Sequence, residues 1–185
     1  MSELPDFIIE GIKGILGNAK NILKKVERHQ FIQNELIKFL QSNDFDTFRE
    51  YNIQYNGKYR IKKKFGEAKD RKNGLIDVYG KFIGLDLAIE YDNSPSLKWK
   101  SIEKLLQSDA QYCFGLSFGP KNQTKGKLAI YHRKNLWKLK QVYKELIIQY
   151  NENQEYDKIH KLISKDFWLG EALQGYFKKI NFKDL

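Results

Sequence analysis

Two short apolar segments, each interrupted by acidic residues, constrain the fold of this chain more than any other part of the sequence. They are Leu75–Tyr79 and Leu85–Asp92, with Gly80 and Gly84 around the turn between them. Apolar runs of this length that are bounded by glycine are typical of β-strands. We therefore expect two consecutive strands with a turn between them.

The acidic residues stand where apolar side chains are expected. Side chains alternate across a strand, so Glu90 and Asp92 share one face of the second strand, and Asp77 interrupts the first. Burying carboxylates is costly unless a cation or hydrogen bonds compensate. If the strands pair through their turn, the three acids converge on an oxygen-rich site for a hard divalent cation, Mg²⁺ or Mn²⁺. The alternative is that the acids are solvated on an exposed face of the sheet.

The other periodicities predict an α/β fold with a mixed central β-sheet flanked by helices. Before the two strands we expect helices over Ile8–Val26 and about Arg28–Gln41, with no breaker between them, and a hairpin around Asn56-Gly57. After them we expect, in order, a helix, two strands and three helices, over Leu97–Gln107, Tyr112–Phe118, Lys127–His132, Asn135–Tyr150, Tyr156–Ser164 and about Glu171–Lys179.

A length of 185 residues suits one domain with one sizeable core. We divide it into an N-terminal helical extension at 1–27, a core at 28–132 and C-terminal helices at 133–185. Gly11, Gly14 and Gly17 weaken the first helix, although their spacing favours close packing against a neighbour.

The charge of the chain favours a polyanionic partner. Lysine and arginine together number 33 against 23 acidic residues, which gives a net charge of +10. Neutralising phosphates releases counterions, and this supplies affinity for nucleic acid that does not depend on sequence. The alternative is a basic surface that binds nothing.

Cysteine content and the apolar runs bear on where the protein works. Cys113 is the only cysteine, which excludes an internal disulfide, favours a reducing compartment and suits a core position. The N-terminus has no secretion-signal pattern, and no apolar run approaches the roughly 18 residues of a membrane span. We expect a cytoplasmic protein without a membrane partner, although a basic amphipathic helix at Ile8–Val26 is also compatible with a membrane surface or a protein partner.

The segment Leu75-Ile76-Asp77-Val78-Tyr79, followed by Leu87-Ala88-Ile89-Glu90-Tyr91-Asp92, resembles the PD-(D/E)XK nuclease superfamily. That family includes many restriction endonucleases and archaeal Holliday-junction resolvases. Its core is a helix, a three-stranded meander, a helix and a further strand, which is the order expected here from about Arg28 to Phe118. The resemblance implies a restriction endonuclease-like core, metal binding by Asp77 and Glu90 with the backbone carbonyl of Tyr91, and a homodimer, because such nucleases are commonly dimeric.

Two positions depart from the family pattern. The family usually has lysine two residues after the glutamate, where this chain has Asp92, which we interpret as a further metal ligand. A lysine of the next helix is the expected substitute. Helical geometry puts Lys98 at the edge of the buried face and turns Lys100 and Lys104 away from it. Lys98 is therefore the predicted contact to phosphate or water, with a solvated surface lysine as the alternative.

The second departure is in the first core helix. Gln33 stands at the position where resolvase-like members often carry an acid, and Glu35 is the nearest substitute. Glu35 is therefore a candidate catalytic residue, with a surface glutamate as the alternative. The three histidines show no spacing that is typical of metal ligands.

A basic stretch just before the Asp77 strand is the predicted nucleic-acid contact. Its cations would flank a phosphate at the acidic site, and the alternative is a solvated loop. A second basic segment, around Arg133 and Lys138, follows later in the chain. The residues assigned to nucleic-acid binding are Arg60, Lys62, Lys63, Lys64, Lys69, Arg71 and Lys72.

These observations predict a metal-dependent DNA endonuclease that hydrolyses phosphodiester bonds. Asp77, Glu90 and Asp92 would form the metal site, and Lys98 would stabilise the attacking water or the phosphate. The alternative is a non-catalytic nucleic-acid-binding module on the same scaffold, because the usual lysine two residues after Glu90 is missing.

Overall fold

A computed structural model describes residues 6–22, 24–55, 73–118, 124–171 and 176–182 of the chain. Within these residues the fold is built on a mixed sheet of six strands in the order β1-β2-β3-β4-β5-β6. Strands β1 to β3 form an antiparallel meander, β3, β4 and β5 are parallel, and β6 is antiparallel to β5. The strands are β1 (Asp46–Gln54), β2 (Asn73–Lys81), β3 (Leu87–Asp92), β4 (Tyr112–Ser117), β5 (Asp166–Glu171) and β6 (Tyr176–Ile180).

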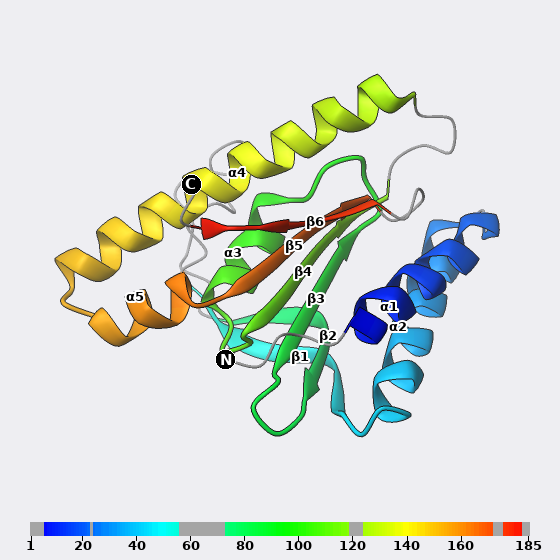
Figure 1. Ribbon diagram of the computed structural model, residues 1–185, viewed down its shortest axis with the longest axis horizontal. Helices are drawn as coiled ribbons and strands as arrows, with labels where there is room; N and C mark the ends of the chain where they lie inside the picture. Colours follow the sequence, from blue (N-terminus) through cyan, green and yellow to red (C-terminus); the bar gives the residue numbers. More distant parts are fainter. Residues whose placement is uncertain (1–5, 23, 56–72, 119–123, 172–175, 183–185) are drawn as a thin grey trace.

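Helices cover both faces of the sheet (Figure 1). Helices α1 (Asp6–Asn18) and α2 (Lys25–Gln41) lie on one face, while α3 (Trp99–Gln107), α4 (Lys125–Glu152) and α5 (Tyr156–Ile163) lie on the other. The predicted fold class, a mixed sheet flanked by helices, is confirmed. No described helix is both long enough and apolar enough to cross a lipid bilayer.

The α1–α2 layer buries an apolar stripe on each of its helices, although Val26, expected on that stripe, is exposed. Ile8, Ile12 and Leu16 of α1 are buried with Ile32 and Leu36 of α2 against the sheet. Gly11 permits this contact, because a Cβ there would lie 2.0 Å from Cζ of Phe39. The expected glycine packing therefore holds at Gly11, whereas Gly14 and Gly17 have open space around them. A short 3₁₀ helix, η1 (Ala19–Asn21), and an extended Ile22 separate the two helices, so they are not continuous.

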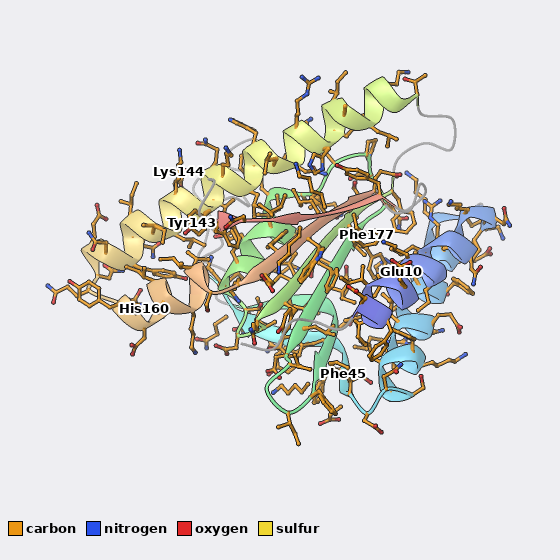
Figure 2. All side chains as sticks on the ribbon, viewed as in Figure 1. Glu10, Phe45, Tyr143, Lys144, His160 and Phe177 are labelled. Carbon is orange, nitrogen blue, oxygen red and sulfur yellow. The ribbon has the colours of Figure 1, made fainter. Side chains whose placement is uncertain are left out.

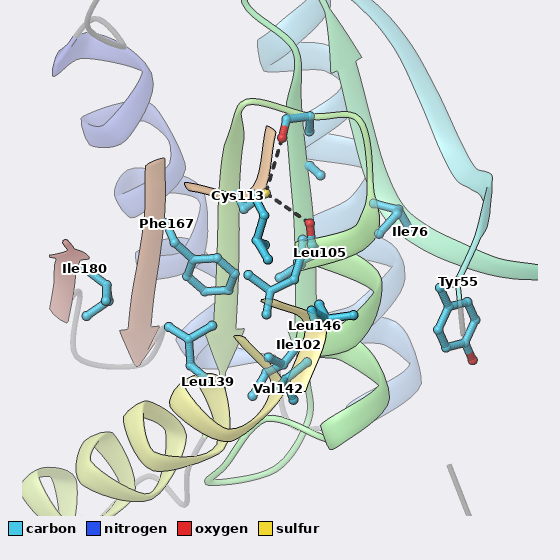
Figure 3. Close-up of a cluster of buried hydrophobic side chains, with 14 of the residues drawn as sticks. Tyr55, Ile76, Ile102, Leu105, Cys113, Leu139, Val142, Leu146, Phe167 and Ile180 are labelled. Atoms are coloured by element: carbon cyan, nitrogen blue, oxygen red, sulfur yellow. Dashed lines mark hydrogen bonds between the residues drawn. The ribbon is translucent and has the colours of Figure 1, made fainter. Parts of the chain in front are cut away.

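The opposite layer packs around Cys113 of β4 (Figure 3). Its thiol is fully buried and contacts the carbonyl oxygens of Leu105 at 3.4 Å and Ala110 at 3.7 Å, beneath Phe167 and Leu139. Burial raises the pKa of this thiol, which favours its neutral form. Cys113 is a core residue, as the sequence predicted.

Two predicted elements after β4 are wrong. Lys127–His132, expected as a strand, is the beginning of α4, where the Thr124 side chain accepts a hydrogen bond from the Lys127 amide at 3.4 Å. The expected helix at about Glu171–Lys179 is replaced by the end of β5 and by β6. Pairing of β6 with β5, together with burial of Ile180, outweighs the local helical tendency, so the C-terminal part of the chain, 133–185, contributes strands as well as helices. Figure 2 shows the side chains of these layers on the ribbon.

Candidate metal centre

The sheet opens between β2 and β3 where the predicted acids lie. The two strands pair only at Val78↔Ile89, Tyr79↔Ala88 and Gly80↔Leu87. Beyond these pairs, carboxylate side chains accept the hydrogen bonds of backbone amides in place of backbone carbonyl groups. The amide of Asp77 donates to Oε1 of Glu90 at 3.3 Å, and the amide of Tyr91 donates to Oδ2 of Asp77 at 3.0 Å. The structure therefore brings Asp77 and Glu90 together across adjacent strands.

The backbone of Asp77 is held from the other side as well. Its carbonyl oxygen accepts a hydrogen bond from Nε2 of Gln33 at 2.8 Å, and Gln33 is buried. On β1, pairs at Arg49↔Val78 and Tyr51↔Ile76 flank Glu50, which would face Asp77 but has a left-handed backbone with a φ of 52°. The strands on both sides of β2 are thus irregular at Asp77. The side chain of Gln33 supplies the hydrogen bond that the carbonyl group of Asp77 would otherwise lack.

Lys104 of α3 forms a buried ion pair with Glu90. Its ammonium group donates to Oε1 of Glu90 and to the carbonyl oxygen of Leu75, and only 9% of its side chain is exposed. The expectation that Lys104 points away from the core is therefore wrong. The helical projection assumed one buried face, but α3 packs against β2 and β3, which Lys104 meets, as well as against α4, and all residues from Ser101 to Leu106 are buried.

Asp92 and Lys98 form a second, more open ion pair. Nζ of Lys98 lies 2.7 Å from Oδ1 of Asp92, and the Lys98 amide donates to Oδ2 at 2.8 Å. The carboxylate is buried, whereas 58% of the lysine side chain is exposed. Asp92 therefore anchors the beginning of α3 and holds the ammonium group of Lys98 beside the other two acids. We refer to Asp77, Glu90 and Asp92 as the acidic cluster.

Burial makes negative charge costly in the acidic cluster. Desolvation and the charge of Asp77 raise the pKa of Glu90 to about 8, although Lys104 opposes the shift. Burial also raises the pKa of Asp77 against the hydrogen bond from Tyr91. Burial acts to lower the pKa of Lys98, but its hydrogen bond and ion pair with Asp92 raise it overall. Three carboxyl groups thus share two ammonium groups, and a further cation would favour their ionised forms.

The acidic cluster is not preassembled as a three-residue metal site. Among the described residues, no group of three or more histidine, cysteine, aspartate or glutamate side chains is arranged to hold a metal ion. Asp77 and Glu90 are the candidate pair for a hard cation, because they face each other on adjacent strands and the charge of Asp77 raises the pKa of Glu90. Asp92 would have to release Lys98 before its carboxylate joined them.

A cleft of ≈ 590 Å³ lies between the first half of α2 and the irregular part of β1. Its lining includes His29, Gln33, Arg49, Glu50 and Asn93, and Gln33 connects it to the acidic cluster through its hydrogen bond to the carbonyl oxygen of Asp77. The hydroxyl of Tyr91 donates to the carbonyl oxygen of His29 at 2.9 Å. The cleft carries both signs of charge.

Other predicted site residues lie elsewhere. Glu35 pairs with Lys38 at 2.8 Å on the solvent side of α2, and the structure does not bring it to the acidic cluster. Gln33, one of two positions weighed in that helix, makes the contact instead. The basic stretch lies outside the described residues, together with all its assigned contacts: Arg60, Lys62, Lys63, Lys64, Lys69, Arg71 and Lys72.

Comparison with known proteins identifies no relative of this chain. A scan against protein-family models finds no match, and searches of curated proteins and of solved structures find none either. The chemistry of the site therefore has to be argued from its own residues.

Proposed function

We propose that this protein is a divalent-metal-dependent endonuclease that hydrolyses phosphodiester bonds in DNA. The observation that carries the proposal is the contact between Asp77 and Glu90 where β2 and β3 part, with Lys98 and Lys104 on the neighbouring carboxylates. The element order α2-β1-β2-β3-α3-β4 supports it, because the resemblance to the PD-(D/E)XK nucleases implies that arrangement. The net charge of +10 suits a polyanionic substrate, and a cytoplasmic location would give access to DNA.

Asp77 and Glu90 would hold the cation, with the carbonyl oxygen of Tyr91 as the further ligand that the resemblance implies. A bound Mg²⁺ or Mn²⁺ supplies a water of lowered pKa and stabilises charge on the phosphate. Lys104 keeps Glu90 in place from the protein side. Lys98 is exposed enough to leave Asp92 and contact a phosphate oxygen or the attacking water. Asp92, which stands at the sequence position of the usual lysine, is then the residue that positions Lys98.

A non-catalytic nucleic-acid-binding module is the second candidate. The specific observation in its favour is that lysine ammonium groups already contact Glu90 and Asp92. Such pairs neutralise the carboxylates and leave a surface able to bind phosphates without cutting them. This reading predicts binding that neither requires metal nor changes when Asp77 is replaced.

A cleavage assay separates the two functions. Supercoiled, linear and branched DNA, with RNA for comparison, would be incubated with the protein in Mg²⁺, Mn²⁺ or EDTA. Asp77→Asn keeps an oxygen to accept the Tyr91 amide and removes the charge, so we expect a rate loss of more than about 100-fold, beyond the effect of outer-shell changes. Asp109→Asn, on an exposed ion pair with Lys161, is the matched control and should cut normally.

Either of two results would refute the endonuclease: no metal-stimulated cutting of any DNA, or cutting by Asp77→Asn at the wild-type rate. Selective cutting of RNA would keep the chemistry and change the substrate. Light scattering with and without DNA would test the expected homodimer.

A further inference from the structure

A second cavity lies beside the acidic cluster, where the parallel strands end. Its volume is ≈ 460 Å³, within the range of ligand pockets. The first turns of α4, the ends of β4 and β5 and the beginning of β6 enclose it. We call it the His132 pocket, and the residues used below are Ser117, Ala129, His132, Asn135, Glu171 and Tyr176.

His132 brings an unpartnered polar atom to this pocket. Its Nε2 is buried and has no hydrogen-bond partner among the described residues. Its ring meets that of Tyr176 edge-on, with centroids 5.3 Å apart. Burial and the charge of Lys178 lower the pKa of His132, so the ring is neutral at physiological pH and can donate or accept one hydrogen bond at Nε2. A buried polar atom without a partner is destabilising, and a ligand atom would compensate for it.

The register of the sheet places the pocket next to Asp92 of the acidic cluster. Asp92 of β3 lies beside Ser117 of β4, which lies beside Glu171 of β5, and neighbouring strands are about 4.8 Å apart. Ser117 and Glu171 line the pocket. Asn135, also in its wall, accepts a hydrogen bond from the Leu97 amide at 2.9 Å, directly before Lys98. One chain of a ligand can therefore lie across both sites.

The helix that forms the pocket wall is basic. From Lys125 to Lys144 the sequence of α4 contains no acidic residue, and its first acid is Glu145. Lys127, Arg133 and Lys134 are exposed around the pocket. Cations at the rim and aromatic rings inside are the combination that binds single-stranded nucleic acid, through phosphates outside and base stacking within.

We propose that the His132 pocket binds one unpaired nucleobase of the DNA strand whose phosphate lies at the acidic cluster. The base stacks on the ring of Tyr176 and forms a hydrogen bond with Nε2 of His132, whose ring stands edge-on to that of Tyr176. The preferred substrate is then DNA with an unpaired base near the cut, such as a bulge, and not uninterrupted duplex. This inference rests on the proposed function for its choice of DNA as the ligand.

Equilibrium binding in EDTA tests the pocket without cleavage. The probes are a short duplex with a single bulged 2-aminopurine and the same duplex fully paired. We expect the wild-type protein to bind the bulged duplex about tenfold more tightly, in line with the stacking of one base on aromatic side chains. The fluorescence of the bulged 2-aminopurine should be quenched on binding, because the base stacks in the pocket.

Two pocket variants and two controls complete the design. Ala129→Trp fills the pocket from an exposed helix position, and His132→Phe removes Nε2 while it keeps a ring. Both should reduce the preference to below about twofold, and His132→Phe should not lower the melting temperature, because it removes an unpaired buried atom. Lys134→Ala should weaken both duplexes equally, and Lys144→Ala, on the outward side of α4 (Figure 2), should change neither.

Equal affinity of wild type for the two duplexes, or an unquenched bulged base, would overturn the pocket proposal and leave the nuclease proposal standing. A full preference in both pocket variants would also overturn it. If the protein binds neither duplex even at low salt, DNA is not its ligand and the proposed function fails instead.

Discussion

The two edges of strand β3 are built in different ways. Toward β4, six consecutive residue pairs keep a regular parallel register. Toward β2, the ladder ends after three pairs, and side chains of Asp77 and Glu90 take over the backbone hydrogen bonds. One strand therefore has a regular edge, which packs apolar side chains on both faces, and an open edge, which gathers charge.

The difference has a physical cause. On the regular edge, apolar side chains such as those of Ile89 and Phe114 face an apolar layer, and the ladder runs without interruption. On the open edge, a regular register would bury two carboxylates against each other without water. Opening of the strands lets each carboxylate accept a backbone amide, and Glu90 also accepts Lys104. We infer that stability resides mainly at the regular edge and that the open edge is kept for chemistry.

The largest loss of stability is expected from truncation of a buried side chain at the regular edge. Phe114→Ala removes a fully buried ring that stacks on Trp168 at 4.8 Å, so the free energy of unfolding should fall by about 4 kcal/mol. Urea denaturation measures the loss. At a temperature where the variant remains folded, metal-stimulated cleavage should be near the wild-type rate. A variant that folds but no longer cuts would show that the two edges are not separate.

A smaller effect is expected from removal of the buried cation at the open edge. Lys104→Met keeps the length of the side chain but removes the buried donor to Glu90 and to the carbonyl oxygen of Leu75, which should cost about 3 kcal/mol at neutral pH. Lys98→Met is the matched variant. Because Lys98 is mostly exposed, its loss should cost less than about 1 kcal/mol.

Cleavage should rank these two lysines the other way round from stability. Under the proposed function, Lys98→Met removes the group that reaches the phosphate or the water, so we expect more than about tenfold loss of rate in a well-folded protein. Denaturation curves and cleavage rates on the same samples test the ranking. Equal losses of stability in the two variants would contradict the distinction between a buried pair and an open pair.

The sequence predicted the pairing of β2 with β3 and the approach of Asp77 to Glu90 because both depend on local pattern, whereas the expected hairpin around Asn56-Gly57 lies outside the described residues. A short turn between two apolar strands leaves one simple antiparallel pairing, and that pairing aligns the two acids. The C-terminal strands escaped prediction because β5 and β6 are fixed by pairing with β4 and with each other, which no local periodicity records.

The role of Lys104 escaped prediction for a similar reason. Its burial depends on β2 and β3, where its ammonium group contacts the carbonyl oxygen of Leu75 and the carboxylate of Glu90, and the periodicity of α3 alone does not record which strands the helix meets. Gln33 was recognised only as a missing acid. An uncharged amide can donate to a carbonyl oxygen, and the opened strand leaves the carbonyl of Asp77 in need of such a donor. A search for polar residues on the buried stripe of α2 would have found it.

The smallest predicted effect concerns Glu50, where the irregularity of the open edge reaches β1. A non-glycine residue with a φ of 52° is strained, and glycine adopts this conformation freely. Because Glu50 is exposed, Glu50→Gly should raise the free energy of unfolding by about 0.5–1 kcal/mol. The greater flexibility of glycine in the unfolded chain will offset part of this gain. Gln154→Gly, with a φ of 58° between α4 and α5, is the control for strain far from the cluster.

Thermal unfolding of the two glycine variants tests whether the strain at Glu50 belongs to the open edge or is ordinary turn strain. If both gain stability equally, the strain at Glu50 is ordinary turn strain. If Glu50→Gly gains stability but also weakens metal-stimulated cleavage, the strained backbone holds the Glu50 side chain in a position that the reaction uses, at the cleft between α2 and β1. A loss of stability at Glu50→Gly would mean that contacts of this side chain, and not neighbouring strands, impose the left-handed conformation. The irregularity of β1 would then arise independently of the open edge.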